Sequence, residues 1–77
     1  MKQLSQPLLK TLAENLRYLR QQKGLSQEEF AEICGYHRTY ISAIECGRRN
    51  ITLMVLESLA VALEVSVPDL LTEKKKS

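Results

Sequence analysis

The sequence predicts an all-α protein that forms a single small domain. The chain has 77 residues, and its apolar side chains recur at intervals of three and four, as they do along one face of a helix. No stretch shows the alternation that is typical of a half-buried strand. Glycine and short polar residues interrupt the apolar pattern at intervals, and they divide the chain into five short helices.

The first helix is predicted to run from about residue 8 to Lys23, after a loose arm over residues 1 to 7. Pro7 suits a first helical turn, because its missing N–H needs no partner there. The inward face is expected to comprise Leu9, Leu12, Ala13, Leu16 and Leu19. Gly24 ends the helix, because glycine readily adopts a left-handed C-terminal cap.

Two further helices are predicted on either side of Gly35. Ser26 caps the second helix, and Glu29 completes a capping box three residues later. The third helix starts with His37 near its N-cap and extends to about Cys46. Because a turn that begins with glycine joins them, the two helices form a helix-turn-helix.

The fourth helix follows a short loop and is capped by Thr52. Its inward side chains are Leu56, Leu59, Ala60 and Leu63. Ser66 and then Pro68 predict the N-cap and first turn of a fifth helix over about residues 67 to 72. A basic tail over residues 73 to 77 is expected to fray.

The third helix has an outward face that differs from an ordinary solvated one. Ile41 and Ile44 are expected to hold the helix to the core. The other side chains are short, flat or able to hydrogen-bond, namely Arg38, Thr39, Tyr40, Ser42 and Ala43. Such side chains fit the DNA major groove, where Arg38 can bond a guanine at O6 and N7. A face meant only for water would more often hold Glu and Lys.

The basic charge of the chain is concentrated near this helix. The formal net charge is only +2, yet residues 35 to 50 contain Arg38, Arg48 and Arg49 against Glu45 alone. A local basic cluster is the footprint expected of a protein that binds a polyanion. The alternative is a solvated charged face, which charge by itself does not exclude.

The stretch LSQEEFAEICGYHRTYISAIECGRRNITLMVLESLAVALEVSVPDLL resembles the Cro/C1-type (xenobiotic-response-element) helix-turn-helix domain. The resemblance implies a compact lambda-repressor-like domain over residues 8 to 72. Within that family, HRTYISAIECGRRNITL is most similar to the controller proteins of restriction-modification systems, which are small homodimeric regulators. Phage repressors of the Cro/C1 type share this fold and length, and they are the alternative.

The resemblance also implies a role for each matching residue. Base contacts are expected from Arg38, Thr39, Tyr40 and Ala43. Contacts to the DNA backbone are expected from Gln27, His37, Ser42, Arg48, Arg49 and Asn50. Arg20 and Glu45 match a family ion pair that joins the first helix to the end of the third, and losing one partner of such a pair costs about 3 kcal/mol when it is fully buried.

Two positions depart from the family pattern. Cys46 stands where a polar residue or arginine is usual, which removes one phosphate contact. Ala43 offers only an apolar contact, so we expect the shape of the DNA to contribute to recognition.

The fourth and fifth helices carry more aliphatic side chains than one small core needs. A helix that is apolar all round is buried on more than one side. We therefore expect a two-fold dimer through an interface of Leu53, Met54, Val61, Val67 and Leu71. The alternatives are that these aliphatics are simply exposed, or that they bind another protein, as in an antitoxin.

The remaining reactive side chains have ordinary explanations. Cys34 and Cys46 are expected to be reduced thiols, with a redox switch as the less favoured reading. His37 is expected to contact backbone or phosphate at a helix N-terminus rather than to sense pH. Tyr18 and Tyr36 are expected to pack at the edge of the core rather than to stack on nucleic acid.

The sequence does not favour an enzyme. Glu28, Glu29 and Glu32 suit the first turns of a helix, and no nucleophile or histidine is expected beside them. No metal site is expected, because the ligand spacings of a zinc site are absent. The expected DNA binding needs no cofactor and no small-molecule substrate. No run approaches the roughly 20 apolar residues of a membrane helix. The expected partners are double-stranded operator DNA, a second copy of the chain and RNA polymerase, in the cytoplasm.

Overall fold

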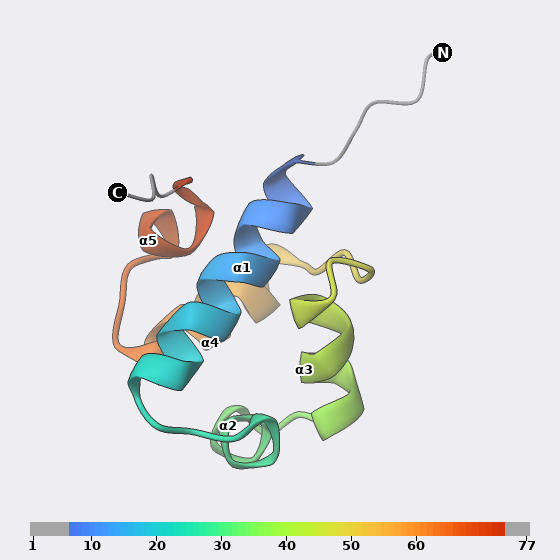
Figure 1. Cartoon of the computed structure of the whole chain (residues 1–77), viewed down its shortest axis with the longest axis vertical. Helices are drawn as coiled ribbons and strands as arrows, with labels where there is room; N and C mark the ends of the chain where they lie inside the picture. Colours follow the sequence, from blue (N-terminus) through green and yellow to red (C-terminus); the bar gives the residue numbers. More distant parts are fainter. Residues whose placement is uncertain (1–6, 74–77) are drawn as a thin grey trace.

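Five α-helices follow one another in this computed structural model, which describes residues 7 to 73 (Figure 1). They are α1 (Pro7–Gln22), α2 (Gln27–Cys34), α3 (Arg38–Glu45), α4 (Leu53–Leu63) and α5 (Val67–Leu71). The described residues contain no strand, so the all-α prediction is confirmed. Apart from Pro7 and Glu73, the predicted arm and the predicted basic tail lie outside the described residues.

Local interactions define both ends of α2. The Ser26 hydroxyl accepts from the backbone N–H of Glu29 at 3.0 Å, and the Glu29 carboxylate accepts from the backbone N–H of Ser26 at 2.9 Å. Gly35 closes α2 in the left-handed conformation, at φ 81°, a region that side chains with a Cβ seldom enter. The chain therefore turns sharply, and α3 begins three residues later at Arg38.

α4 ends in a way that the sequence did not predict. Thr52 caps its start as expected, accepting from the backbone N–H of Val55 at 3.1 Å. Its end is closed by Glu64, which adopts the left-handed conformation at φ 61° without being glycine. The Lys23 ammonium lies 2.7 Å from the Glu64 carboxylate, so a contact to the end of α1 accompanies this unusual cap.

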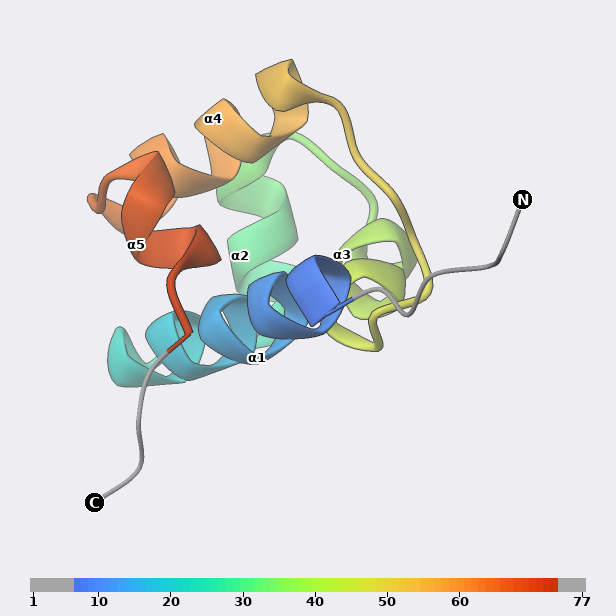
Figure 2. The same cartoon turned by 90° about the horizontal axis from the view of Figure 1, so that it is seen from above.

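All five helices contribute to one core. Figure 2 shows α1 and α4 on opposite sides of the molecule, with α2, α3 and α5 completing the enclosure. The core comprises Leu12, Leu16, Phe30, Ala31, Ile41, Ile44, Leu56, Leu59, Ala60, Leu63 and Leu70. Leu9, predicted on the inward face of the first helix, is only half-buried and lies outside this core. None of these five helices has the length and apolar character needed to cross a membrane.

Candidate nucleic-acid interface

The start of α3 presents free polar side chains to solvent. Arg38 and Thr39 occupy its first turn and are exposed. His37, the N-cap residue, is also exposed and makes no side-chain capping bond. The buried isoleucines Ile41 and Ile44 hold the opposite side of the helix against the core. This helix is therefore fixed by its apolar side, while its amino end is available to a ligand.

The middle of α3 is less accessible than its first turn. Ser42 and Ala43, which the sequence assigned to backbone and base contacts, are half-buried. Tyr40 is half-buried too, and it packs against the core. Of the residues predicted to contact bases, Arg38 and Thr39 are thus exposed, and Tyr40 is partly exposed.

Tyr40 lies between two other side chains. Its ring meets that of Tyr36 edge-on, with the ring centres 5.2 Å apart at 61°. The guanidinium carbon of Arg49 lies 5.1 Å from the centre of the Tyr40 ring, which is a cation–π distance. The Tyr36 hydroxyl is bonded in turn to the Ser58 hydroxyl of α4 at 2.8 Å. Tyr40 therefore supports a basic side chain of the following loop, a role that the sequence did not predict.

The loop after α3 carries basic side chains. Arg48, Arg49 and Asn50 are all exposed. The loop is tied down by a bond from the Arg48 backbone N–H to the Ala43 carbonyl at 3.2 Å. The Asn50 side-chain oxygen accepts from the backbone N–H of Ile51 at 3.0 Å, so it shapes the loop. The two positive charges of this loop are therefore the exposed side chains of Arg48 and Arg49.

A buried ion pair joins the helix-turn-helix to α1. Arg20 and Glu45 are 7% and 5% exposed. Arg20 Nε and Nη2 donate to the two Glu45 carboxylate oxygens at 2.6 and 3.0 Å, and Arg20 Nη1 donates to the Leu25 carbonyl at 2.6 Å. The bidentate geometry satisfies both charges, which a buried pair requires.

The same carboxylate also holds Gln27, at the start of α2. Gln27 Nε2 donates to Glu45 Oε1 at 3.0 Å. Gln27 is half-buried, and this bond holds its amide against the end of α3. Arg17 approaches the same oxygen at 3.8 Å and stays 55% exposed. This arginine was not singled out from the sequence, because nothing in the helical pattern of α1 marks it.

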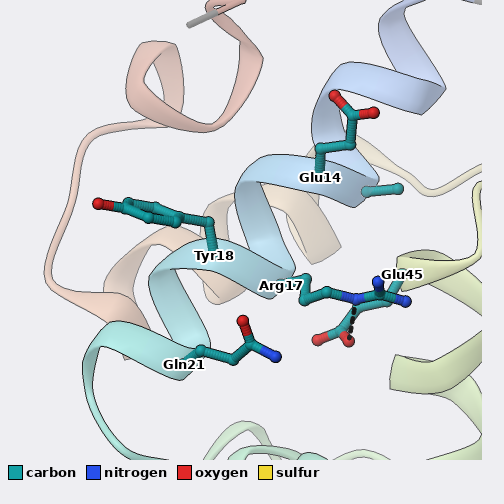
Figure 3. Close-up of a pocket in the computed structure, with 6 residues that line it drawn as sticks. Glu14, Arg17, Tyr18, Gln21 and Glu45 are labelled. Carbon is teal, nitrogen blue, oxygen red and sulfur yellow. Dashed lines mark ion pairs between the residues drawn. The ribbon is translucent and has the colours of Figure 1, made fainter. Parts of the chain in front are cut away.

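The hollow beside this ion pair is shallow (Figure 3). Its volume is about 160 Å³. It is lined by Ala13, Glu14, Arg17, Tyr18, Gln21 and Glu45. Tyr18 is 55% exposed, so the prediction that it packs at the edge of the core is wrong: the outer side of α1 is not covered there. Tyr36, by contrast, does pack against the core. No cluster of metal-binding side chains occurs among residues 7 to 73.

Both cysteines are free thiols with different surroundings. Cys34 is half-buried at the end of α2, and burial raises the pKa of its thiol to about 11. Such a thiol is a poor nucleophile at neutral pH. Cys46 is exposed at the end of α3.

The aliphatic side chains predicted to form a dimer interface differ in exposure between α4 and α5. We call this surface the α4–α5 face, and it comprises Leu53, Met54, Val61, Val67 and Leu71. Leu53, Met54 and Val61 on α4 are 82%, 81% and 70% exposed. Val67 and Leu71 on α5 pack partly against the core. A groove of about 500 Å³ between α2 and α4 adds Ile33, which is 58% exposed and was not predicted to lie at this surface.

The helix-turn-helix, its buried ion pair and its basic loop define a class of nucleic-acid-binding domain. The family model "Helix-turn-helix" (HTH_3) matches residues 16–70, and the chain belongs to this family. This is the Cro/C1-type family that the sequence motifs resemble.

Within the family, the chain is similar to control proteins of restriction-modification systems. It is 56% identical over 63 residues to control protein C.SmaI of Serratia marcescens, covering 82% of this chain and 75% of that protein. The crystal structure of the hypothetical transcription factor NHTF from Neisseria matches with a TM-score of 0.84 and 43% identity, covering 95% of this chain and 85% of that one. The restriction-modification controller protein C.Esp1396I, solved as a tetramer with its natural 35 base-pair operator, matches with a TM-score of 0.72 and 34% identity, covering 84% and 96%.

Proposed function

We propose that this chain is a sequence-specific DNA-binding regulator of transcription that acts as a homodimer on a pseudo-palindromic operator. We further propose that it is the controller of a restriction-modification system and regulates its own promoter from the cytoplasm. The observation that carries the proposal is the exposed first turn of α3, which offers Arg38 and Thr39, together with the exposed Arg48 and Arg49 of the loop that follows α3. The relationship to C.SmaI and C.Esp1396I supports it.

The proposed division of labour follows from exposure and chemistry. Arg38 and Thr39 enter the major groove and read base edges, with Tyr40 and Ala43 at the border of the contact. Phosphate contacts fix the register, and they are assigned to Gln27, His37, Ser42, Arg48, Arg49 and Asn50. Gln27 suits this role because Glu45 holds its amide in place at 3.0 Å, so little conformational freedom is lost when DNA binds.

Dimerisation is assigned to the α4–α5 face. Three large aliphatic side chains of α4 are exposed on it, and in a soluble regulator a second copy of the chain would cover them. A two-fold axis there would place two copies of α3 about 34 Å apart, one turn of B-DNA, on one side of the duplex. Activation of a promoter would in addition require contact with RNA polymerase, for which we assign no residues.

The proposal is tested by fluorescence anisotropy with purified protein. One duplex carries the DNA upstream of the protein's own gene, and the other carries the same bases in scrambled order, each at two salt concentrations. We expect binding to the upstream DNA to be at least about a thousandfold tighter, as for specific regulators. A steep salt dependence on both duplexes is expected from phosphate contacts.

Equal binding to the two duplexes would overturn autoregulation. Equal and weak binding, together with co-purification of a second protein on the α4–α5 face, would favour the alternative of an antitoxin-like module.

A further inference from the structure

α5 has an unusual end. It has only five residues, and Thr72 follows it in an extended conformation, at φ −94° and ψ 124°. The left-handed closure that ends α2 and α4 is therefore absent from this helix. Its last carbonyl groups still need donors, because buried backbone oxygens without hydrogen bonds are costly.

A side chain of α1 supplies those donors. Asn15 Nδ2 donates to the carbonyls of Leu70 at 2.9 Å, Thr72 at 2.9 Å and Asp69 at 3.3 Å. Asn15 is 7% exposed, so these bonds are shielded from water. Three carbonyl oxygens also fix the orientation of the amide, because only its nitrogen can face them. Asn15 thus caps α5 from a helix more than 50 residues away in sequence.

This contact determines where part of the α4–α5 face lies. Val67 and Leu71 are on α5. In the sequence, Leu71 stands between Leu70 and Thr72, whose carbonyl groups both accept hydrogen bonds from Asn15. Leu70 points into the core and is fully buried, whereas Val67 and Leu71 are only partly covered. In Figure 1, α5 lies beside α1, as these bonds require. Leu70 anchors the helix, and Asn15 fixes the carboxyl end that presents Leu71.

We propose that Asn15 is a positioning residue for self-association: it holds α5 in the orientation in which Val67 and Leu71 meet a second copy of the chain. The inference rests on the homodimer of the proposed function. It adds that the affinity of the dimer is controlled from α1, by a buried side chain that does not touch the partner.

The test uses Asn15→Asp and Asn15→Ala in the full chain, with the dimer dissociation constant measured by analytical ultracentrifugation. Asn15→Asp keeps the shape but sets a carboxylate against three carbonyl oxygens, and Asn15→Ala removes the whole amide group and with it the donors. We expect both variants to keep their helical circular dichroism and to dimerise at least about tenfold more weakly, because the carbonyls must turn toward water.

Two controls separate positioning from general stability. Ile44→Val removes one methylene from the core side of α3, whereas α5 packs mainly against α1 and α4. This variant should lower the melting temperature and leave the dimer constant unchanged. Val61→Asp places a charge in the exposed half of the α4–α5 face and should abolish the dimer.

The outcomes are distinguishable. If Val61→Asp leaves self-association intact, the α4–α5 homodimer of the proposed function is wrong. If Val61→Asp abolishes the dimer and both Asn15 variants dimerise like the wild type, the role of Asn15 alone is wrong. Loss of helical signal in both Asn15 variants would make Asn15 a determinant of monomer folding, and it would also overturn the proposal.

Discussion

Gln27 and Glu45 are joined by a 3.0 Å hydrogen bond from Gln27 Nε2 to Glu45 Oε1, between the start of α2 and the end of α3. The same carboxylate binds Arg20 of α1 through both of its oxygens. One buried carboxylate therefore ties three helices together at the surface proposed to meet DNA. Because those bonds are short and shielded, the relative placement of Gln27 and α3 is set before any ligand arrives.

Glu45→Gln should destabilise the fold strongly. It keeps the shape of the side chain but leaves the buried Arg20 guanidinium without its counter-charge. We expect a loss of about 3 kcal/mol in the free energy of unfolding, measured by urea denaturation. The matched double variant Arg20→Met with Glu45→Leu, which removes both charges, should be less destabilised than Glu45→Gln. A single variant within about 0.5 kcal/mol of the wild type would mean that the pair is dispensable.

Arg38→Ala should reduce discrimination between DNA sequences. Arg38 is exposed on the first turn of α3 and can bond a guanine through two donors. We expect a loss of about 1–3 kcal/mol in binding to the operator, with specificity relaxed at one base pair of each half-site. Anisotropy titrations against operators substituted one pair at a time measure this. An equal loss on operator and random DNA would exclude Arg38 as a base-reading residue.

Arg48→Ala should instead weaken binding to every sequence alike. Its backbone is held by the Ala43 carbonyl at 3.2 Å, and its side chain is exposed in the basic loop. Removing one phosphate contact should lower the slope of log affinity against log salt by about one. Lys23→Ala is a suitable control, because that ammonium is paired with Glu64 at 2.7 Å. A slope unchanged from the wild type would show that Arg48 does not meet phosphate.

Tyr40 should act on DNA binding partly through Arg49. The Arg49 guanidinium lies 5.1 Å from the centre of the Tyr40 ring, and Tyr40→Phe preserves that ring. A double-mutant cycle of Tyr40→Leu and Arg49→Ala, measured on operator affinity, should give a coupling of about 0.5–2 kcal/mol. The cycle with Tyr40→Phe in place of Tyr40→Leu should give much less. Additive effects in the first cycle would mean that the stacking has no part in recognition.

The helices could be predicted because residues close together in the sequence determine where each helix begins and ends. The Ser26–Glu29 capping box and the Thr52 cap each involve residues three apart, and the structure forms both. The Arg20–Glu45 ion pair could be predicted because the two residues match a family motif, and in the structure the two side chains form this pair. These features need no knowledge of how distant parts of the chain come together.

Features that depend on distant contacts were missed. In the sequence, Asn15 is a single polar residue on the apolar face of a helix. Only the folded structure places its side chain against the carbonyl groups of Asp69, Leu70 and Thr72. Tyr40 packs partly against the core, and Arg49 of the following loop lies over its ring. Tyr18 was expected at the edge of the core, yet its side chain is 55% exposed. The left-handed cap of α4 is Glu64, whereas such caps are usually recognised in a sequence by a glycine.

Cys34 should make stability depend on pH in the alkaline range. Burial raises the pKa of its thiol from 9.0 to about 11. Below pH 9 the thiol is protonated in both the folded and the unfolded chain. Between pH 9 and about pH 11 the unfolded chain loses this proton first, so the free energy of unfolding should fall across that window.

Urea denaturation at several pH values measures this effect. Cys34→Ala should remove part of the alkaline decline, whereas the control Cys46→Ala, at an exposed site, should retain it. Each variant changes one cysteine and leaves the rest of the chain as it is, so the difference between the two variants isolates the Cys34 contribution. Identical pH dependence in Cys34→Ala and the wild type would mean that the Cys34 thiol is not shielded in solution.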